Sequence, residues 1–118
     1  MLSEHFTDSD FACHCGCGFG TNPGDVNPLL IAGLDRIWEI VGPYTLNSVC
    51  RCANHNRIVG GEPGSQHTFG NAADISGPPV DDLIKAALHV EAFVHGGIGT
   101  YHDRIHVDTR GHMARWRK

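Results

Sequence analysis

Apolar residues recur at helical spacing in two long segments of the chain. The first segment begins after Asn27, has Pro28 in its first turn and stops at Gly42 and Pro43. Asparagine is a favourable N-cap and proline fits the first helical position, so residues 28–41 are predicted to form a helix. Its apolar face is expected to provide much of the core: Leu30, Leu34, Ile37, Trp38 and Val41.

The second segment, "VDDLIKAALHVEAFVH" at residues 80–95, follows two prolines and ends at Gly96 and Gly97. Two aspartates stand near its beginning, where acidic side chains favour a helix N-terminus. Its apolar stripe is formed by Leu83, Ile84, Ala87 and Leu88. The pattern predicts a second long helix.

Shorter elements fill the remaining sequence. Thr7 followed by Asp10 predicts a capped helical turn, and a short helix is predicted at 53–59. Strand-forming patterns lie at 44–49, 71–75, 97–101 and 105–109, the last two joined by "HDR" as a hairpin. This order predicts an α+β fold with a small antiparallel sheet and helices mainly on one face.

The chain has 118 residues, which suits one domain with one core. We divide it into a cysteine-containing segment at 1–26, a core at 27–111 and a basic tail at 112–118. The formal net charge of −4 gives no general attraction to nucleic acid or to an anionic membrane. The basic tail is expected to be a solvated terminus, with contact to an anionic polymer as the alternative.

No apolar run approaches the roughly 18 residues of a membrane span. The first residues, "MLSEHFTDSD", are too acidic for a signal peptide. We therefore expect a soluble monomer that is made in the cytoplasm.

Nine histidines and five cysteines direct attention to metal binding. The stretch "SQHTFGNAAD" places His67 and Asp74 on either side of small residues. A catalytic zinc ion takes three protein ligands and keeps an open position, so a third ligand is needed. The best candidate is His106, which shares a strand face with Asp108. Asp103 lies in the turn before it, and only a turn or bulge would bring both to one site.

The small residues of this stretch also have a structural role. Gly70, Ala72 and Ala73 would let the backbone turn from the His67 loop into the strand of Asp74. They would also let a helix pack closely behind that strand. Larger side chains would push the two ligands apart.

Three ordered motifs resemble one family of enzymes. "SQHTFGNAAD" matches the S-x-H-x-x-G-x-A-x-D signature of the zinc D-alanyl-D-alanine carboxypeptidases, which also include L-alanyl-D-glutamate endopeptidases of bacteriophage lysis. "DRIHVDTRG" is similar to the second block of that family, and "NSVCRCANHNRIVGG" to an upstream stretch. The likeness runs from about residue 30 to 111, although Val49 and Cys50 replace the usual small and aromatic residues.

The resemblance implies a hedgehog-like zinc peptidase fold and a role for each motif residue. Zinc would be held by His67, Asp74 and His106, with Asp103 as general base. Arg51 would face the substrate and support the developing negative charge. Arg57 is the substitute for Arg51, and Asp108 is the second choice as base. Further substrate contacts are expected from Ser65, Gln66, Tyr101 and His102, and with less weight from Asn54 and Asn56.

The function implied is hydrolysis of a peptide bond that involves a D-amino acid in the stem peptides of peptidoglycan. A phage or prophage lysis enzyme is expected, reaching the wall through a holin or within a virion. The alternative is a non-catalytic binding module, because hedgehog signalling domains keep a related zinc site. A purely structural zinc is a third interpretation, but it would normally have four protein ligands.

The cysteines form a second unusual pattern, "CHCGC" followed by "CRC". One possibility is a disulfide from the N-terminal loop to the Cys50 and Cys52 region. Another is a separate structural zinc bound by Cys13, Cys15, Cys17 and Cys52, and a third is free thiols. We expect none of the cysteines at the catalytic metal.

Overall fold

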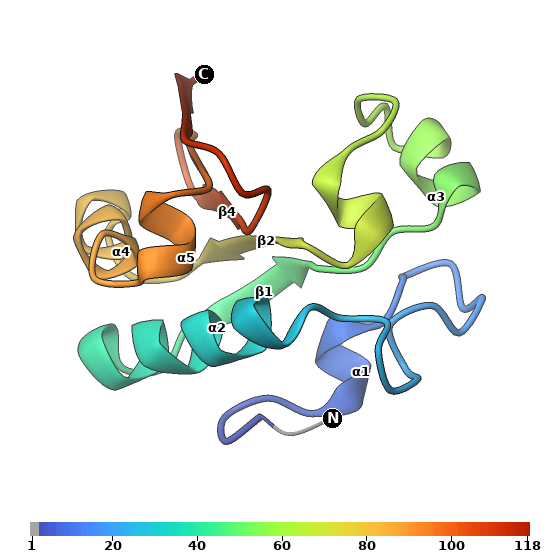
Figure 1. The fold of residues 1–118 in the computed structure, drawn as a ribbon, viewed down its shortest axis with the longest axis horizontal. Helices are drawn as coiled ribbons and strands as arrows, with labels where there is room; N and C mark the ends of the chain where they lie inside the picture. Colours follow the sequence, from blue (N-terminus) through green and yellow to red (C-terminus); the bar gives the residue numbers. More distant parts are fainter. Residues whose placement is uncertain (1–2) are drawn as a thin grey trace.

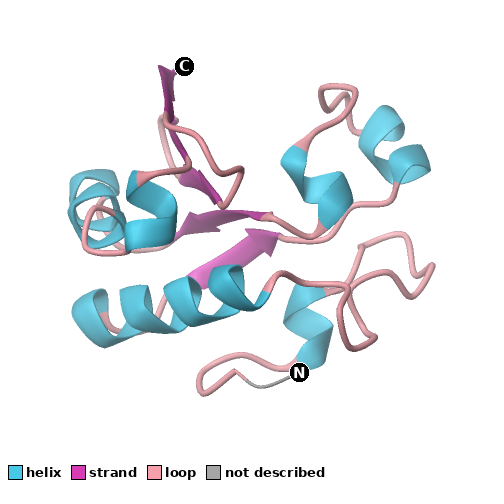
Figure 2. Cartoon of the chain, in the orientation of Figure 1, coloured by secondary structure: helices cyan, strands magenta, loops and turns pink. Residues whose placement is uncertain are grey.

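Within residues 3–118, which the computed structural model describes, five strands form one sheet in the order β1-β2-β4-β3-β5 (Figures 1 and 2). The three inner pairings, β1 with β2, β2 with β4 and β3 with β4, are antiparallel, whereas β5 pairs in parallel with β3. The sheet is therefore mixed at one edge. The strand bounds are β1 Thr45–Ser48, β2 Ala72–Ser76, β3 Gly97–Thr100, β4 Ile105–Asp108 and β5 Ala114–Arg117.

Helices cover one face of this sheet, as the sequence predicts. Three of them, α2 (Pro28–Val41), α4 (Val80–Ala87) and α5 (Glu91–Val94), pack together beside the strands (Figure 1). The short helix α1 (Asp8–Phe11) lies on the N-terminal side of α2. The helix α3 (Ala53–Ile58) and the 3₁₀ helix η1 (Gln66–Phe69) follow β1 and precede β2, on the side of the molecule away from α4 and α5 (Figure 1). None of these helices is long and apolar enough to cross a membrane within the described chain.

The core lies between α2, α4, α5 and one face of the sheet. Helix α2 begins where predicted, because the Asn27 side chain accepts a hydrogen bond from Leu29 N at 2.9 Å. The strands contribute every second residue, as the pleat requires. The fully buried aliphatic residues at this interface include Leu30, Leu34, Ile37, Ile75, Leu83, Ile105 and Val107.

The N-terminal segment is part of this core. Phe11 and Val26 are buried in it, and Phe6 packs edge-on against Trp38. Asp35 of α2 accepts hydrogen bonds from Ser3 Oγ at 2.8 Å and from the backbone N–H groups of residues 4 and 5. The predicted capping box between Thr7 and Asp10 is present at α1. Residues 3–26 are thereby fixed to the rest of the chain.

The prediction of a second long helix is wrong, because this segment forms two helices, α4 and α5. Helix α4 ends at Ala87, and Val90 is extended before α5 begins. Leu88, expected in the apolar stripe, is 49% exposed. The break lets Phe93 pack against α2 at Gly33, where an added Cβ would lie 2.7 Å from the phenyl ring. Close packing between helices overrides the helical periodicity.

The basic tail is also not a free terminus. Residues 114–117 form β5, with an alternating pattern of exposure, and Arg115 donates hydrogen bonds to the carbonyls of Gly96 and Val94 at 2.8 Å. The sequence "ARWR" is not predicted as a strand because its two arginines make it resemble a charged terminus. Trp116 alternates with the arginines and points to the face of the sheet opposite the helices.

Candidate metal centre

One row of residues crosses the open face of the sheet. Asp74 of β2 lies opposite His106 of β4, His106 lies opposite Gly99 of β3, and Gly99 lies beside Trp116 of β5. On β2, the residues on either side of Asp74, Ala73 and Ile75, face the helical core. The period of two therefore places Asp74 and His106 side by side on the face that the helices leave open.

His67 reaches this row from η1, just before β2. The Ser65 side chain caps this helix by accepting a hydrogen bond from His67 N at 3.3 Å, and the His67 carbonyl accepts one from Arg51 N at 3.1 Å. Gly70 ends η1 in the left-handed conformation (φ 70°), and its Cα lies against the Asp25 carbonyl with no room for a side chain. The glycine of the motif is thus required by both conformation and packing.

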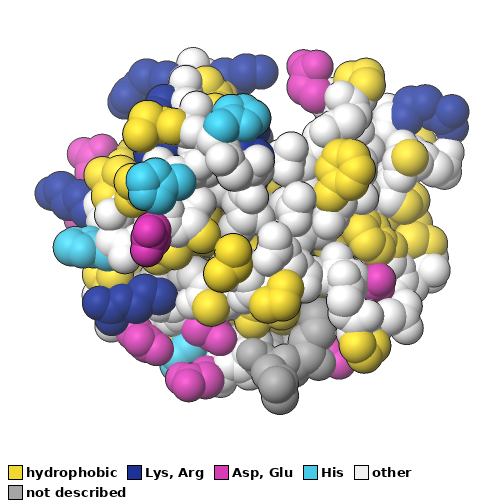
Figure 3. All heavy atoms as spheres, in the orientation of Figure 1, with side chains coloured by type: hydrophobic (Ala, Val, Ile, Leu, Met, Phe, Trp, Pro, Cys, Tyr) yellow, Lys and Arg dark blue, Asp and Glu magenta, His cyan; other side chains and the backbone are white. Residues whose placement is uncertain are grey.

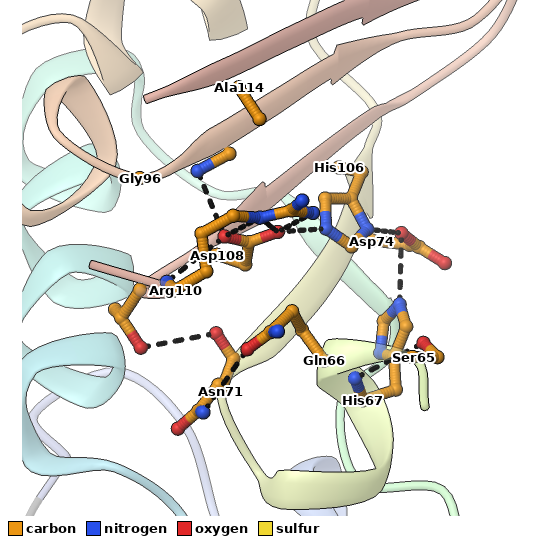
Figure 4. Close-up of polar contacts among 12 residues, drawn as sticks. Ser65, Gln66, His67, Asn71, Asp74, Gly96, His106, Asp108, Arg110 and Ala114 are labelled. Atoms are coloured by element: carbon orange, nitrogen blue, oxygen red, sulfur yellow. Dashed lines mark hydrogen bonds and ion pairs between the residues drawn. The ribbon is translucent and has the colours of Figure 1, made fainter. Parts of the chain in front are cut away.

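The three predicted metal ligands converge (Figure 4). Asp74 Oδ1 lies 3.4 Å from His67 Nε2 and 3.1 Å from His106 Nδ1. One nitrogen or oxygen atom from each of the three side chains lies within 4.8 Å of the others. The side chains of His67 and His106 are only 3% and 9% exposed. This geometry brings together His67, Asp74 and His106 as the sequence predicts.

Hydrogen bonds on the far side of each ring direct one nitrogen toward Asp74. His67 Nδ1 lies 2.8 Å from the Val49 carbonyl, which can only accept, so Nδ1 carries the proton. His106 Nε2 lies 2.8 Å from Asp108 Oδ2 and donates to it. The lone pairs left for a metal are then on His67 Nε2 and His106 Nδ1, the atoms that converge. Two such imidazoles and one carboxylate fit a zinc ion with an open fourth position.

The same contacts shift the acidity of these groups. Burial raises the pKa of Asp74, but the imidazoles of His106 and His67 outweigh burial and hold that pKa well below its usual range. Burial lowers the pKa of His106, and its bonds to Asp108 and Asp74 more than reverse this. Asp74 is therefore ionised at neutral pH, as a metal ligand must be.

Asp108 orients His106 and cannot act as the alternative base. Its side chain is fully buried and accepts hydrogen bonds from His106 Nε2, from Gly97 N at 2.8 Å and from the Arg110 guanidinium at 2.7 Å (Figure 4). All its lone pairs thus face donors. The expectation that Asp108 could replace Asp103 as base is wrong, because this carboxylate has no access to the open side of the site.

Two glycines and a tryptophan surround His106 and Asp108, and sequence reasoning missed their role. A Cβ on Gly97 would lie 2.4 Å from Asp108 Oδ2, and one on Gly99 would lie 2.3 Å from the Trp116 ring. The Trp116 ring can therefore cross β3 and pack on His106, with ring centroids 5.0 Å apart. The signal available in the sequence was the alternation of glycine in "GGIGT".

The metal centre forms part of a cleft of about 710 Å³. One wall is the loop at 59–66, and the other is the end of the β3–β4 hairpin with β5. The molecule is notched between these parts, and basic side chains stand beside the C-terminal strand (Figure 3). The cleft is lined by only two acidic side chains, Glu62 and Asp74, but by four basic ones: Arg51, Arg104, Arg110 and Lys118.

Arg51, and not Arg57, belongs to this cleft. Arg51 Nη1 donates to Asn56 Oδ1 at 2.9 Å, and Nη2 lies 3.7 Å from Asp74 Oδ2. Arg57 is exposed and bonded to Asn54 within α3. Gly61 permits the Arg51 arrangement, because its Cβ would collide with both Asn56 and Arg51. The "HN" and double-glycine positions of the motif therefore hold the arginine at the site.

The expected substrate residues are divided between the cleft and the surface. Ser65, Gln66 and Tyr101 line the cleft, and Tyr101 Oη accepts a hydrogen bond from Trp116 Nε1 at 3.1 Å. His102 and Asp103 are exposed at the hairpin turn and do not line it. Asp103 is 70% exposed and pairs with Arg104 at 3.0 Å. Its role as base stays a prediction.

The cysteines separate into a group and a single buried residue. Cys13, Cys15, Cys17 and Cys52 lie together, with one sulfur from each within 4.8 Å of the others. Cys50 is packed in the core, where burial raises its pKa to about 12. All five are free thiols in the structure and lie outside the cleft.

Asp108→Asn should weaken zinc binding by about 10- to 100-fold, because the amide no longer fixes the His106 ring and tautomer. The affinity can be measured by competition with a chromogenic chelator. Asp103→Asn is the matched control on the same hairpin and should leave the affinity unchanged. Equal zinc affinity in Asp108→Asn and the original chain would contradict the orienting role.

Comparison with known proteins agrees with this arrangement. No curated protein matches the chain in sequence. A family model described as Peptidase M15 matches residues 4–108, a range that contains all three converging ligands, Arg51 and the cysteine group. Because this match covers most of the chain, the protein belongs to the M15 family of zinc metallopeptidases.

Proposed function

We propose that the protein is a zinc-dependent peptidase that hydrolyses a bond involving a D-amino acid in peptidoglycan stem peptides. The observation that carries this proposal is the convergence of His67 Nε2, Asp74 Oδ1 and His106 Nδ1 beside an open cleft. A zinc ion held by these atoms would polarise the scissile carbonyl and activate water near neutral pH. The protein would act as a monomer at the cell wall, released by phage lysis machinery or carried in a virion.

Arg51 is placed to support the reacting carbonyl or a substrate carboxylate. Its side chain is 12% exposed, and Asn56 and Ser48 fix its guanidinium at 2.9 Å and 3.4 Å. A preorganised donor of this kind stabilises negative charge as it develops, at no cost in reorganisation. Arg51 Nη2 also lies 3.7 Å from Asp74 Oδ2, and Arg51 lines the cleft.

The charge of the cleft favours an acidic peptide. Arg104 stacks on Tyr101 at 4.4 Å, and Arg110 lies 5.1 Å from the Trp116 ring. These contacts hold cations and aromatic faces together on one wall. Stem peptides offer free carboxylates and few aromatic groups, so the two arginines are expected to contact the substrate.

Asp103 is the proposed general base, acting from the hairpin turn. Its partner Arg104 is itself in the cleft wall, and the turn at 101–104 joins β3 to β4 directly before His106. For proton transfer the carboxylate must come within about 3 Å of the attacking water. To reach that water, this exposed side chain would have to turn away from Arg104.

The direct test is digestion of purified peptidoglycan by the zinc-loaded protein, followed by mass analysis of the fragments. Free D-alanine would identify a carboxypeptidase, and separation of glycan from peptide would identify an L-alanyl-D-glutamate endopeptidase. His67→Ala, which removes a ligand, and chelated protein are the controls and should be inactive. If zinc-loaded protein binds peptidoglycan without cleaving it, the non-catalytic binding module replaces this proposal.

Asp103→Ala should retain zinc and lose turnover, because its carboxylate is not a ligand but would move the proton. General-base groups contribute about 100- to 10,000-fold to the rate. Zinc content and kcat should be measured on the same sample. Unchanged kcat would mean that another group is the base, and Asp108 is excluded by its burial.

Arg51→Met should lower kcat/KM by about 100- to 1000-fold, the usual loss for one donor to a developing oxyanion. Zinc content is measured in parallel, because Arg51 also lies near Asp74. Arg57→Met is the matched control, since this arginine lies in the same region but outside the cleft, and it should cleave normally. Similar losses in both variants would rule out a specific role for Arg51.

A further inference from the structure

We infer that Cys13, Cys15, Cys17 and Cys52 form a second metal site, which holds a structural zinc ion apart from the catalytic centre. Three of these cysteines come from one loop, and the fourth comes from the start of α3. The fold brings their sulfur atoms within 4.8 Å of one another. None of the four lines the cleft of the proposed active site.

The distances between sulfur atoms suit coordination. Cys13 Sγ and Cys15 Sγ are 3.4 Å apart, and Cys15 Sγ and Cys52 Sγ are 3.7 Å apart. A disulfide requires about 2.0 Å. Four thiolates around one zinc ion, each at about 2.3 Å from the metal, lie roughly 3.8 Å apart. The observed spacing therefore matches the edges of a tetrahedral zinc site and not a covalent bridge.

The backbone around the cysteines supports thiolate ligands. Cys52 N donates to Cys13 Sγ at 3.4 Å, and His55 N donates to Cys52 Sγ at 3.3 Å. Such donors stabilise negative charge on sulfur. Gly16, at φ 82°, forms a turn in which its N–H donates to the Cys13 carbonyl at 3.2 Å. This left-handed turn lets alternate residues of the loop direct their sulfurs to one point.

The chemistry of the group distinguishes it from the catalytic centre. Four soft sulfur ligands suit a tetrahedral zinc ion, and a closed set of four leaves no position for water. Such a site stabilises structure. Cys50 is not part of this group, because its sulfur is directed to the Asp25 carbonyl at 3.9 Å and does not converge with the other four.

The position of Cys52 connects the proposed zinc site to Arg51 of the cleft. Cys52 is the N-cap of α3 and directly follows Arg51. Helix α3 carries Asn56, the residue that fixes the Arg51 guanidinium. A metal at the four cysteines would tie the loop at 13–17 to the start of α3. It would thereby hold the segment that presents Arg51 to the cleft.

The site is tested by metal analysis of the full chain, made with zinc and purified under reducing conditions. We expect two zinc ions per chain, and one in Cys15→Ala/Cys17→Ala. Both residues are exposed, so the substitutions disturb no core packing. His67→Ala/His106→Ala should retain the cysteine-bound ion, which separates this proposal from the proposed function. Cys50→Ala is the matched cysteine control and should keep both ions.

Cobalt provides a second, spectroscopic measurement. Cobalt-loaded protein should show the strong sulfur-to-cobalt charge-transfer absorption of a tetrahedral thiolate site, which the histidine and aspartate site cannot produce. The absorption should vanish in Cys15→Ala/Cys17→Ala and persist in Cys50→Ala. The melting temperature of the double variant should fall by about 5 °C or more.

Three results would overturn the inference. The first is a single zinc ion in the original chain that disappears with His67→Ala/His106→Ala. The second is a disulfide among the four cysteines, detected by mass spectrometry after alkylation of protein that was purified under reducing conditions. The third is a cobalt spectrum without sulfur charge transfer.

Discussion

The antiparallel pairing of β2 with β4 is the constraint on which the site depends. It places Asp74 directly opposite His106, while Ala73 lies opposite Val107 and faces the core. A slip of one residue would turn the carboxylate into the apolar layer and an aliphatic side chain into the cleft. Burial of the aliphatic face therefore fixes the ligand geometry, and the ligands do not have to stabilise the register themselves.

A buried polar network around Asp108 lies behind His106, on the side away from the other two ligands. Asp108 accepts from His106, Arg110 and the backbone of Gly97, so that its charge is fully compensated inside the protein. The space for this carboxylate exists because residue 97 has no side chain. Removal of any one partner would leave a buried charge incompletely satisfied. The network thus couples the orientation of the His106 ring to the pairing of β3 with β4.

The sequence predicted the elements whose signals are local. Helix α2, the hairpin of β3 and β4, the capping box at α1 and the three converging ligands were all found from spacing, caps and the family resemblance. The break before α5 was missed because its cause is the contact between Phe93 and Gly33, two residues far apart in the sequence. Strand β5 was missed because two of its four residues, Arg115 and Arg117, are charged. The position of the Asp103 side chain depends on Arg104 and on the turn, which spacing alone cannot determine.

The arrangement separates two tasks between two parts of the fold. The sheet and η1 carry the ligands, whereas Arg51, the loop at 59–66, the β3–β4 turn and β5 supply the other groups that line the cleft. With a divalent ion bound by neutral histidines and ionised Asp74, the centre itself would keep a net positive charge. Arg51, Arg104, Arg110 and Lys118 add to it, although the chain as a whole has a formal charge of −4. A positive cleft in a net-negative molecule would direct anionic ligands to one place, because the remaining surface repels them.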